Sequence, residues 1–279
     1  MTKYNSGQSA FGYHRAATVD ECERLYSFKY GLRLEPKRMV DAPALGSLVH
    51  LACMHRYLAM MGREVLDPAE AIRRAPQRIA HMVPKALEVF GRFAAWAEGA
   101  DRDLKVLSVE TEYEARIDGR RITARLDLVA QRGAELLVLD HKTTSGDLRG
   151  EVRSQAGEGQ VALLDAIGES VVAPAFGLQF GGVWITAIGT AGQEPIAVRG
   201  RARPPAFWRD AVLGAISGSL ARAAEIEARL DWRTIDGALA LAPSPGACRG
   251  RYRSSRCAFY DACRHGPEVL TGLHSEFDA

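Results

Sequence analysis

The sequence has few of the features that place a protein in a membrane or outside the cell. Its 279 residues contain no run of about eighteen apolar residues, which excludes a transmembrane helix. Met1–Phe11 is polar and has no apolar core of the kind found in secretory signals, so we expect a cytoplasmic protein. Lysine is also scarce: six of the 36 basic residues are lysines, and each one is worth considering as a functional group.

Neither charge nor cysteine content identifies a partner by itself. The formal net charge is only +2. Five cysteines without a secretory signal argue against a disulfide scaffold, which leaves a metal site or chemically silent thiols. Hydrophobic residues make up 47% and charged residues 25%, as in ordinary globular proteins, and the length allows one large domain or one domain with appendages.

The hydrophobic pattern changes from helical to strand-like near residue 104. Thr18-Val-Asp-Glu21 has the pattern of a capping box, and Pro84 is expected to break a helix. The predicted helices cover 18–30, 44–61, 67–98, 159–168 and 207–230. The predicted strands cover 109–117, 122–128, 135–140, 178–188 and 196–199.

This order of elements predicts an α/β protein with a mixed sheet. We expect one folded domain over 18–265 between flexible tails at 1–17 and 266–279. Its expected parts are a helical part at 18–100, a core sheet at 104–203, and a long helix with a cysteine-rich segment at 204–265.

Two neighbouring strands carry acidic residues that should meet. Asp140 and Lys142 point to one face because side chains alternate along a strand. Asp127, on the preceding antiparallel strand, can meet Asp140 across the pair. Two carboxylates suit Mg²⁺ or Mn²⁺, and a nearby lysine can orient or deprotonate a water or stabilise a phosphate. The alternative is a polar strand end entering a loop.

Two other residues are candidates for the same site. His50 lies on the predicted second helix, and its imidazole would suit Mn²⁺ better than Mg²⁺, although a lone helical histidine is more often structural. Glu110 is a weaker candidate. Its strand carries three glutamates on one face, for which a solvated sheet face is the simpler interpretation.

Three motifs together resemble the PD-(D/E)XK nuclease superfamily. They are Gly46-x-x-x-His50 on a helix, Arg125-Leu-Asp127 on a strand, and Asp140-x-Lys142 after an apolar run. More narrowly they resemble the RecB-like branch, which includes CRISPR-associated RecB-like exonucleases, the AddB nuclease domain and many phage exonucleases. The resemblance implies a restriction-endonuclease-like core, with a central mixed sheet flanked by helices, and metal-dependent cleavage of DNA.

The resemblance also implies a role for each residue of the site. The implied ligands of Mg²⁺ or Mn²⁺ are His50, Asp127, Asp140 and the backbone carbonyl of His141. Lys142 is the implied catalytic lysine. Gln160 matches the glutamine of the branch's Q-x-x-x-Y motif, although Leu164 stands in place of the tyrosine. Asp140 fills a position that is often glutamate.

Three cysteines near the C-terminus have the spacing C-x8-C-x5-C. By spacing alone, a metal site and unligated thiols both stay open; four thiolates could hold a [4Fe–4S] cluster or Zn²⁺. RecB-like nucleases resemble this arrangement, with a further cysteine on an N-terminal helix. The resemblance implies a structural [4Fe–4S] cluster, with Zn²⁺ as the alternative, on Cys22, Cys248, Cys257 and Cys263. Cys53 has no counterpart and is expected to be a small buried side chain.

Basic and aromatic residues alternate in the same C-terminal segment. The candidate DNA contacts are Arg249, Arg251, Tyr252, Arg253 and Arg256. Their charge suits a phosphate backbone and the aromatic ring can stack on an unpaired base. Arg199, Arg201 and Arg203 form a second basic cluster, and a solvated loop is the alternative for both. No base-reading motif is evident, so we expect little sequence specificity.

The sequence therefore predicts a metal-dependent DNA exonuclease acting on single-stranded DNA or on duplex DNA with ends. One alternative is a structure-specific endonuclease on the same core. Another is a non-catalytic DNA-binding or partner protein that retains the cluster. The pathway and its protein partners stay open among recombination, repair, phage replication and CRISPR adaptation.

Overall fold

The computed structural model describes residues 11–34, 41–229, 231–244, 257 and 263. The chain divides into two compact units. One unit includes Met39–Leu213, and the other combines Ala10–Arg38 with Gly214–Ala279. The first contains the sheet, and the second joins segments from both ends of the sequence.

A five-stranded sheet forms the centre of the first unit, with the strands in chain order. The strands are β1 (Lys105–Ile117), β2 (Arg120–Arg132), β3 (Glu135–Thr144), β4 (Gln179–Gly189) and β5 (Ala197–Ala202). Neighbouring strands are antiparallel except β3 and β4, which are parallel. Asp118 and Gly119 both have positive φ, as a tight hairpin turn between β1 and β2 requires. The predicted meander and mixed sheet are confirmed.

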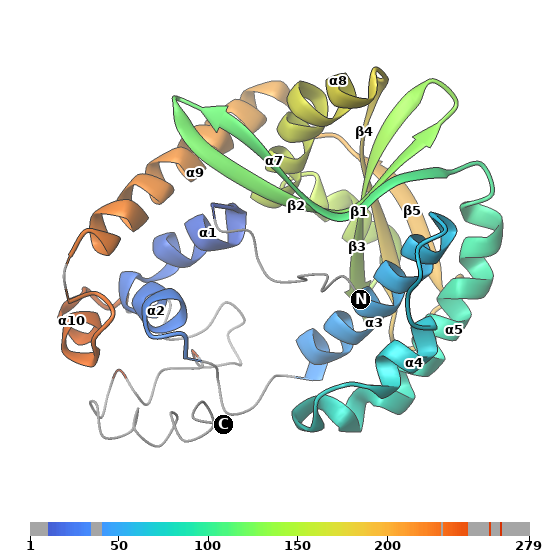
Figure 1. Cartoon of the computed structure of the whole chain (residues 1–279), viewed down its shortest axis with the longest axis horizontal. Coiled ribbons are helices and arrows are strands. Elements are labelled where there is room, and N and C mark those ends of the chain that lie inside the picture. Colours follow the sequence, from blue (N-terminus) through green and yellow to red (C-terminus); the bar gives the residue numbers. More distant parts are fainter. Residues whose placement is uncertain (1–10, 35–40, 230, 245–256, 258–262, 264–279) are drawn as a thin grey trace. The chain divides into compact units, whose positions relative to one another are not determined.

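Helices flank this sheet, as expected (Figure 1). Those before the sheet are α3 (Asp41–Met60), α4 (Pro68–Arg73), the 3₁₀ helix Gln77–Met82 and α5 (Val83–Ala100). The connection that parallel β3 and β4 need consists of α6 (Leu148–Gln155), α7 (Gly159–Ile167), the π-helix Gly168–Val172 and α8 (Ala173–Phe176). Among the described residues, no helix combines the length and the hydropathy needed to cross a bilayer.

The two faces of β3 meet different surroundings. Leu137 and Leu139 belong to the hydrophobic core formed with α3 and α5. Because side chains alternate along a strand, the His141 side chain lies on the same face as these two leucines. Asp140 and Lys142 face the opposite side. On that opposite side lies α7, whose Gln160 contacts Lys142. The sheet therefore separates an acidic face from an apolar face at the end of β3.

The helices differ from the predicted ones at Thr18 and at Pro84, among other boundaries. α1 (Tyr13–Glu21) begins before Thr18, and the Thr18 hydroxyl donates a hydrogen bond to the His14 carbonyl inside the helix instead of capping it. Pro84 lies in the first turn of α5 and so begins a helix rather than breaking one. Proline lacks only an N–H that has no helical partner at that position.

The second unit joins segments that are far apart in sequence. It contains α1, α2 (Glu23–Tyr26), the π-helix Ser27–Gly31, most of α9 (Ala206–Glu227) and α10 (Ile235–Ala240). Tyr26 and Trp232 pack in one buried cluster. The Arg24 guanidinium donates hydrogen bonds to the carbonyls of Leu239 and Leu241, at 2.6 and 2.9 Å. These contacts tie the start of the chain to residues more than two hundred positions later.

Replacing Phe93 of α5 tests how much the hydrophobic core next to His141 contributes to stability. Phe93 is fully buried, and its ring meets that of His141 edge-to-face with 6.0 Å between centroids. Phe93→Ala is expected to lower the free energy of unfolding by about 3–5 kcal/mol, because the lost contacts leave a cavity. Urea denaturation measures the change. Phe207→Ala, at a position 78% exposed, should stay within about 0.5 kcal/mol of the unaltered protein.

Candidate active site

Asp127 and Asp140 lie opposite each other on β2 and β3. The last paired residues before them are Leu128 and Leu139, and the same register continued by one step brings the two aspartates together. Directly opposite residues of an antiparallel pair share a face. Asp140 is only 2% exposed and Asp127 is half-buried. The convergence of carboxylates expected from the hairpin is therefore present.

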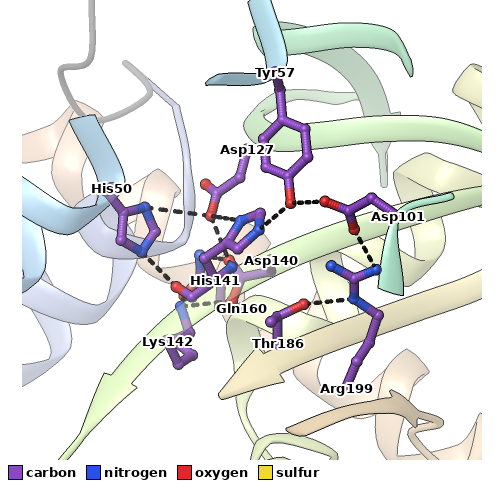
Figure 2. Close-up of polar contacts among 10 residues, drawn as sticks. All are labelled: His50, Tyr57, Asp101, Asp127, Asp140, His141, Lys142, Gln160, Thr186 and Arg199. Carbon is purple, nitrogen blue, oxygen red and sulfur yellow. Dashed lines mark hydrogen bonds and ion pairs between the residues drawn. The ribbon is translucent and has the colours of Figure 1, made fainter. Parts of the chain in front are cut away.

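His50 of α3 reaches the same point. Its Nε2 lies 2.5 Å from the carbonyl oxygen of His141, and its Nδ1 lies 3.4 Å from Oδ2 of Asp127 (Figure 2). The His141 amide donates a hydrogen bond of 3.0 Å to the same Asp127 oxygen. One turn before His50, a Cβ on Gly46 would lie 2.9 Å from the Thr143 hydroxyl. The glycine of the motif thus lets α3 approach β3 closely.

Lys142 is held by two side chains on the acidic face. Its Nζ lies 2.9 Å from Oδ2 of Asp140 and donates a hydrogen bond of 3.0 Å to Oε1 of Gln160 (Figure 2). The Gln160 amide in turn donates to Oδ1 of Asp140 at 3.4 Å. The replacement of the motif's tyrosine by Leu164, which is buried in α7, does not keep Gln160 away from the site.

Glu110 joins this group, although the sequence favoured a solvated position for it. Its ligand atom lies within 4.8 Å of those of His50 and Asp127; among the described residues, no other set of three potential ligands meets this limit. Val109 pairs with Leu128, so Glu110 stands opposite Asp127. Its φ of +48° is left-handed, a conformation that is uncommon and strained for a non-glycine residue. The signal available in the sequence was its register opposite Asp127.

The carboxylates crowd one another electrostatically. Burial raises the pKa of Glu110 to about 8, with a further contribution from Asp127. Burial and Asp127 also raise the pKa of Asp140, against the lowering effect of Lys142. Burial acts in the same direction on Asp127, but His50, the His141 amide and Lys142 together hold its pKa below the ordinary value. The raised pKa values of Glu110 and Asp140 show that their charged forms are unfavourable in this group, and a bound cation would stabilise those charged forms.

The donor set fits a hard divalent ion. Two carboxylates, an imidazole and a backbone carbonyl are suitable ligands for Mg²⁺ or Mn²⁺. Oδ2 of Asp140 is buried, and within the described part of the chain the contact given for it is the ion pair of 2.9 Å with Lys142 Nζ. A buried carboxylate oxygen with spare lone pairs is what a metal ligand needs.

Comparison with known proteins agrees with this geometry. The family model of the PD-(D/E)XK nuclease superfamily matches residues 10–264. The chain belongs to this superfamily. PD-(D/E)XK nucleases use divalent metals, and their substrate is DNA. The resemblance seen in the sequence is thus confirmed at the level of the superfamily, and the fold is the expected one.

Other comparisons give more distant likenesses of this PD-(D/E)XK protein. None of the curated proteins matches the chain. A crystal structure from Eubacterium rectale, named provisionally as an exonuclease, has 13% identity and a TM-score of 0.48 over 90% of this chain and 86% of its own. The structure of SSO0001 has 11% identity and a TM-score of 0.31 over 74% and 84%. Scores this low carry no argument about activity.

Three of the described cysteines of this PD-(D/E)XK protein, Cys22, Cys257 and Cys263, belong to the second unit. Cys22 is buried between α1 and α2. Cys257 and Cys263 are half-buried and pack beside Phe28 and Leu34. Cys22, Cys257 and Cys263 form no disulfide, and their thiols do not lie within 4.8 Å of one another as a set. Cys248 lies outside the described residues. Cys53 is buried in α3, as expected.

The predicted DNA contacts have mixed outcomes. Arg249, Arg251, Tyr252, Arg253 and Arg256 lie outside the described residues. The prediction that Arg199 contacts DNA as part of a second basic cluster is wrong. Its side chain is only 8% exposed and forms an ion pair of 2.8 Å with Asp101. Arg201 and Arg203 are exposed.

Proposed function

We propose that this chain is a Mg²⁺- or Mn²⁺-dependent exonuclease of the RecB-like kind that hydrolyses phosphodiester bonds at DNA ends. The observation that carries the proposal is the convergence of His50, Asp127, Asp140 and the His141 carbonyl beside Lys142. A histidine from a helix, two acids from adjoining strands and a buried lysine together suit metal-assisted phosphodiester hydrolysis.

The surroundings of each residue support its role. His50, Asp127, Asp140 and the His141 carbonyl would hold the metal, which when bound polarises the phosphoryl oxygen and activates water. Lys142 would orient the attacking water and stabilise charge on the phosphate. Gln160 would keep the lysine in place, since its Oε1 accepts a hydrogen bond from Nζ. Glu110 would add a further carboxylate beside Asp127.

A [4Fe–4S] cluster held by Cys22, Cys248, Cys257 and Cys263 belongs to the same proposal. Cys22, Cys257 and Cys263 fall within one compact unit. A tetrahedral Zn²⁺ with Zn–S bonds of about 2.3 Å would bring its sulfurs to roughly 3.8 Å from one another. A single Zn²⁺ on the same thiolates is the alternative to the cluster. The role of the cluster would be structural, since it would link the two ends of the chain.

Linear and closed DNA separate the proposed exonuclease from its main rival. With Mg²⁺ or Mn²⁺, linear DNA is expected to be degraded while a covalently closed circle of the same sequence stays intact, because attack would require an end. Gel electrophoresis over time measures both. A nicked circle is the matched control, since it supplies ends without changing sequence. Cleavage of the closed circle would favour a structure-specific endonuclease.

A non-catalytic DNA-binding protein is the third candidate. The grouping of His50, Glu110 and Asp127, and the ion pair of Lys142 with Asp140, favour the enzyme over it. Recombination, repair, phage replication and CRISPR adaptation all require processing of DNA ends. The pathway, and any protein partner in it, stays a prediction from the sequence.

A further inference from the structure

We infer that a buried polar network, consisting of Tyr57, Asp101, Arg199 and Thr186, positions the metal site by holding His141 from the apolar side of the sheet (Figure 2). The inference rests on the proposed function, because it takes the groups around His141 as parts of a metal site. None of the four residues would touch the metal or the DNA. They are positioning residues, which act through His141.

The network starts at the imidazole of His141. Its Nε2 lies 3.4 Å from the hydroxyl of Tyr57, which donates a hydrogen bond of 3.0 Å to Oδ2 of Asp101. Because the hydroxyl proton goes to Asp101, the tyrosine oxygen can only accept from the histidine. On the other side of the ring, Nδ1 of His141 lies 3.8 Å from Oδ2 of Asp127, so the imidazole joins the network to the metal site.

The network then returns to the strand next to His141. Asp101 caps the C-terminus of α5 and forms an ion pair with Arg199 of β5 at 2.8 Å. Nε of Arg199 donates a hydrogen bond of 2.9 Å to the hydroxyl of Thr186 on β4. Thr186 is the register partner of His141 across the parallel pair. Side chains from α3, the end of α5, β4 and β5 thus enclose one residue of β3.

Burial makes this arrangement rigid. Tyr57, Asp101, His141 and Thr186 are at most 3% exposed. Asp101 is paired with two arginines, since Arg56 also lies 3.4 Å away. Polar groups this deep must keep their partners, because a buried group left without one loses its hydrogen bonds to water as well. The network therefore has few alternative arrangements.

His141 transmits this rigidity to the site through its backbone. Its amide donates to Asp127 and its carbonyl oxygen meets His50, so the peptide groups on both sides of its Cα belong to the metal site. Phe93 packs edge-to-face on the same imidazole. A small rotation of His141 would displace the carbonyl ligand and Asp127 together. Groups that orient metal ligands from behind commonly change metal affinity about 10- to 100-fold.

Tyr57→Phe tests the inference, since it removes one hydroxyl and keeps the ring. Calorimetric titration of the whole protein with Mn²⁺ alone, without DNA, is expected to show an affinity lower by about tenfold. The Mn²⁺ concentration for half-maximal cleavage should rise by the same factor. Excess metal should bring the rate back toward that of the unaltered protein, because no group that would touch the DNA has changed.

Tyr26→Phe is the matched control. Tyr26 is also fully buried, and its hydroxyl also lies between an arginine and a carboxylate, those of Arg15 and Glu227 in the second unit. Its loss is expected to reduce stability but to leave Mn²⁺ affinity unchanged. Should Tyr57→Phe not fold, Thr186→Val and Thr186→Ser take its place: valine should lower the affinity, and serine, which keeps the hydroxyl, should restore it.

The outcomes separate this inference from the proposed function. Equal Mn²⁺ affinity in the unaltered protein and in Tyr57→Phe, or an equal loss in Tyr26→Phe, would refute the network. Asp127→Asn tests whether the proposed metal site binds Mn²⁺ at all. If Asp127→Asn loses Mn²⁺ binding while Tyr57→Phe does not, only the network is rejected. If Asp127→Asn binds Mn²⁺ as the unaltered protein does, the metal site is rejected and the network with it.

Discussion

Lys142→Ala is expected to reduce metal-dependent DNA cleavage at least about a hundredfold while DNA binding is kept. The ammonium group is held by Asp140 and Gln160 beside the carboxylates, so no other described lysine can replace it. Cleavage is measured on end-labelled linear DNA with Mg²⁺ or Mn²⁺. Binding is measured by fluorescence anisotropy with the same DNA and Ca²⁺.

Asp140→Ala is expected to reduce metal-dependent DNA cleavage as much as Lys142→Ala does. It removes a proposed metal ligand and the ion-pair partner of Lys142 at once. Lys85→Ala is the matched control, because Lys85 is a surface lysine of α5 that pairs with Glu88. Undiminished cleavage by both Lys142→Ala and Asp140→Ala would show that another part of the chain carries the activity.

Cys22→Ser is expected to remove the iron of the proposed cluster and to destabilise the second unit. A cross-link between Cys22 and Cys248 would close a loop of more than two hundred residues. Chain-entropy arguments give a link over such a loop about 5 kcal/mol of stabilisation, as an upper value. Iron analysis and visible absorption report the cluster. Hydrogen exchange should show faster opening of α1, α2 and α10 than of β1–β5.

Cys53→Ser is the control for this experiment. Cys53 is as buried as Cys22, at 2% against 7% exposure, but lies on α3 beside His50. Its replacement should cost stability and leave about four irons per chain. A native protein with one equivalent of zinc and no iron would contradict the cluster. So would equal iron content in Cys22→Ser and the unaltered protein.

The carboxylates could be located from the sequence because their positions depend on local rules. Alternation along one strand places Asp140 beside Lys142, and the tight turn after β2 fixes the register that brings in Asp127. The tight turn between β1 and β2 likewise sets Glu110 opposite Asp127. Alternation alone favoured a solvated position for Glu110, because it shares a face with Glu112 and Glu114, and alternation does not describe its left-handed φ.

The network behind His141 could not be predicted, because its members come from separate parts of the chain. Tyr57, Asp101 and Arg199 lie on α3, the end of α5 and β5, and no spacing relates them. Arg199 was assigned to DNA because it stands in a basic cluster, whereas Asp101 and Thr186 bind it inside the fold. Charge in the sequence shows that a partner is needed, but it does not show whether that partner is internal.

The second unit also has a consequence for biosynthesis. Arg24 needs the carbonyls of Leu239 and Leu241, and Tyr26 needs Glu227, so α1 and α2 must wait for the segment 227–241. All strands of the sheet have left the ribosome before that segment does. A nascent chain can therefore complete its β-sheet first, while α1 and α2 acquire their partners only after α10 has been synthesised.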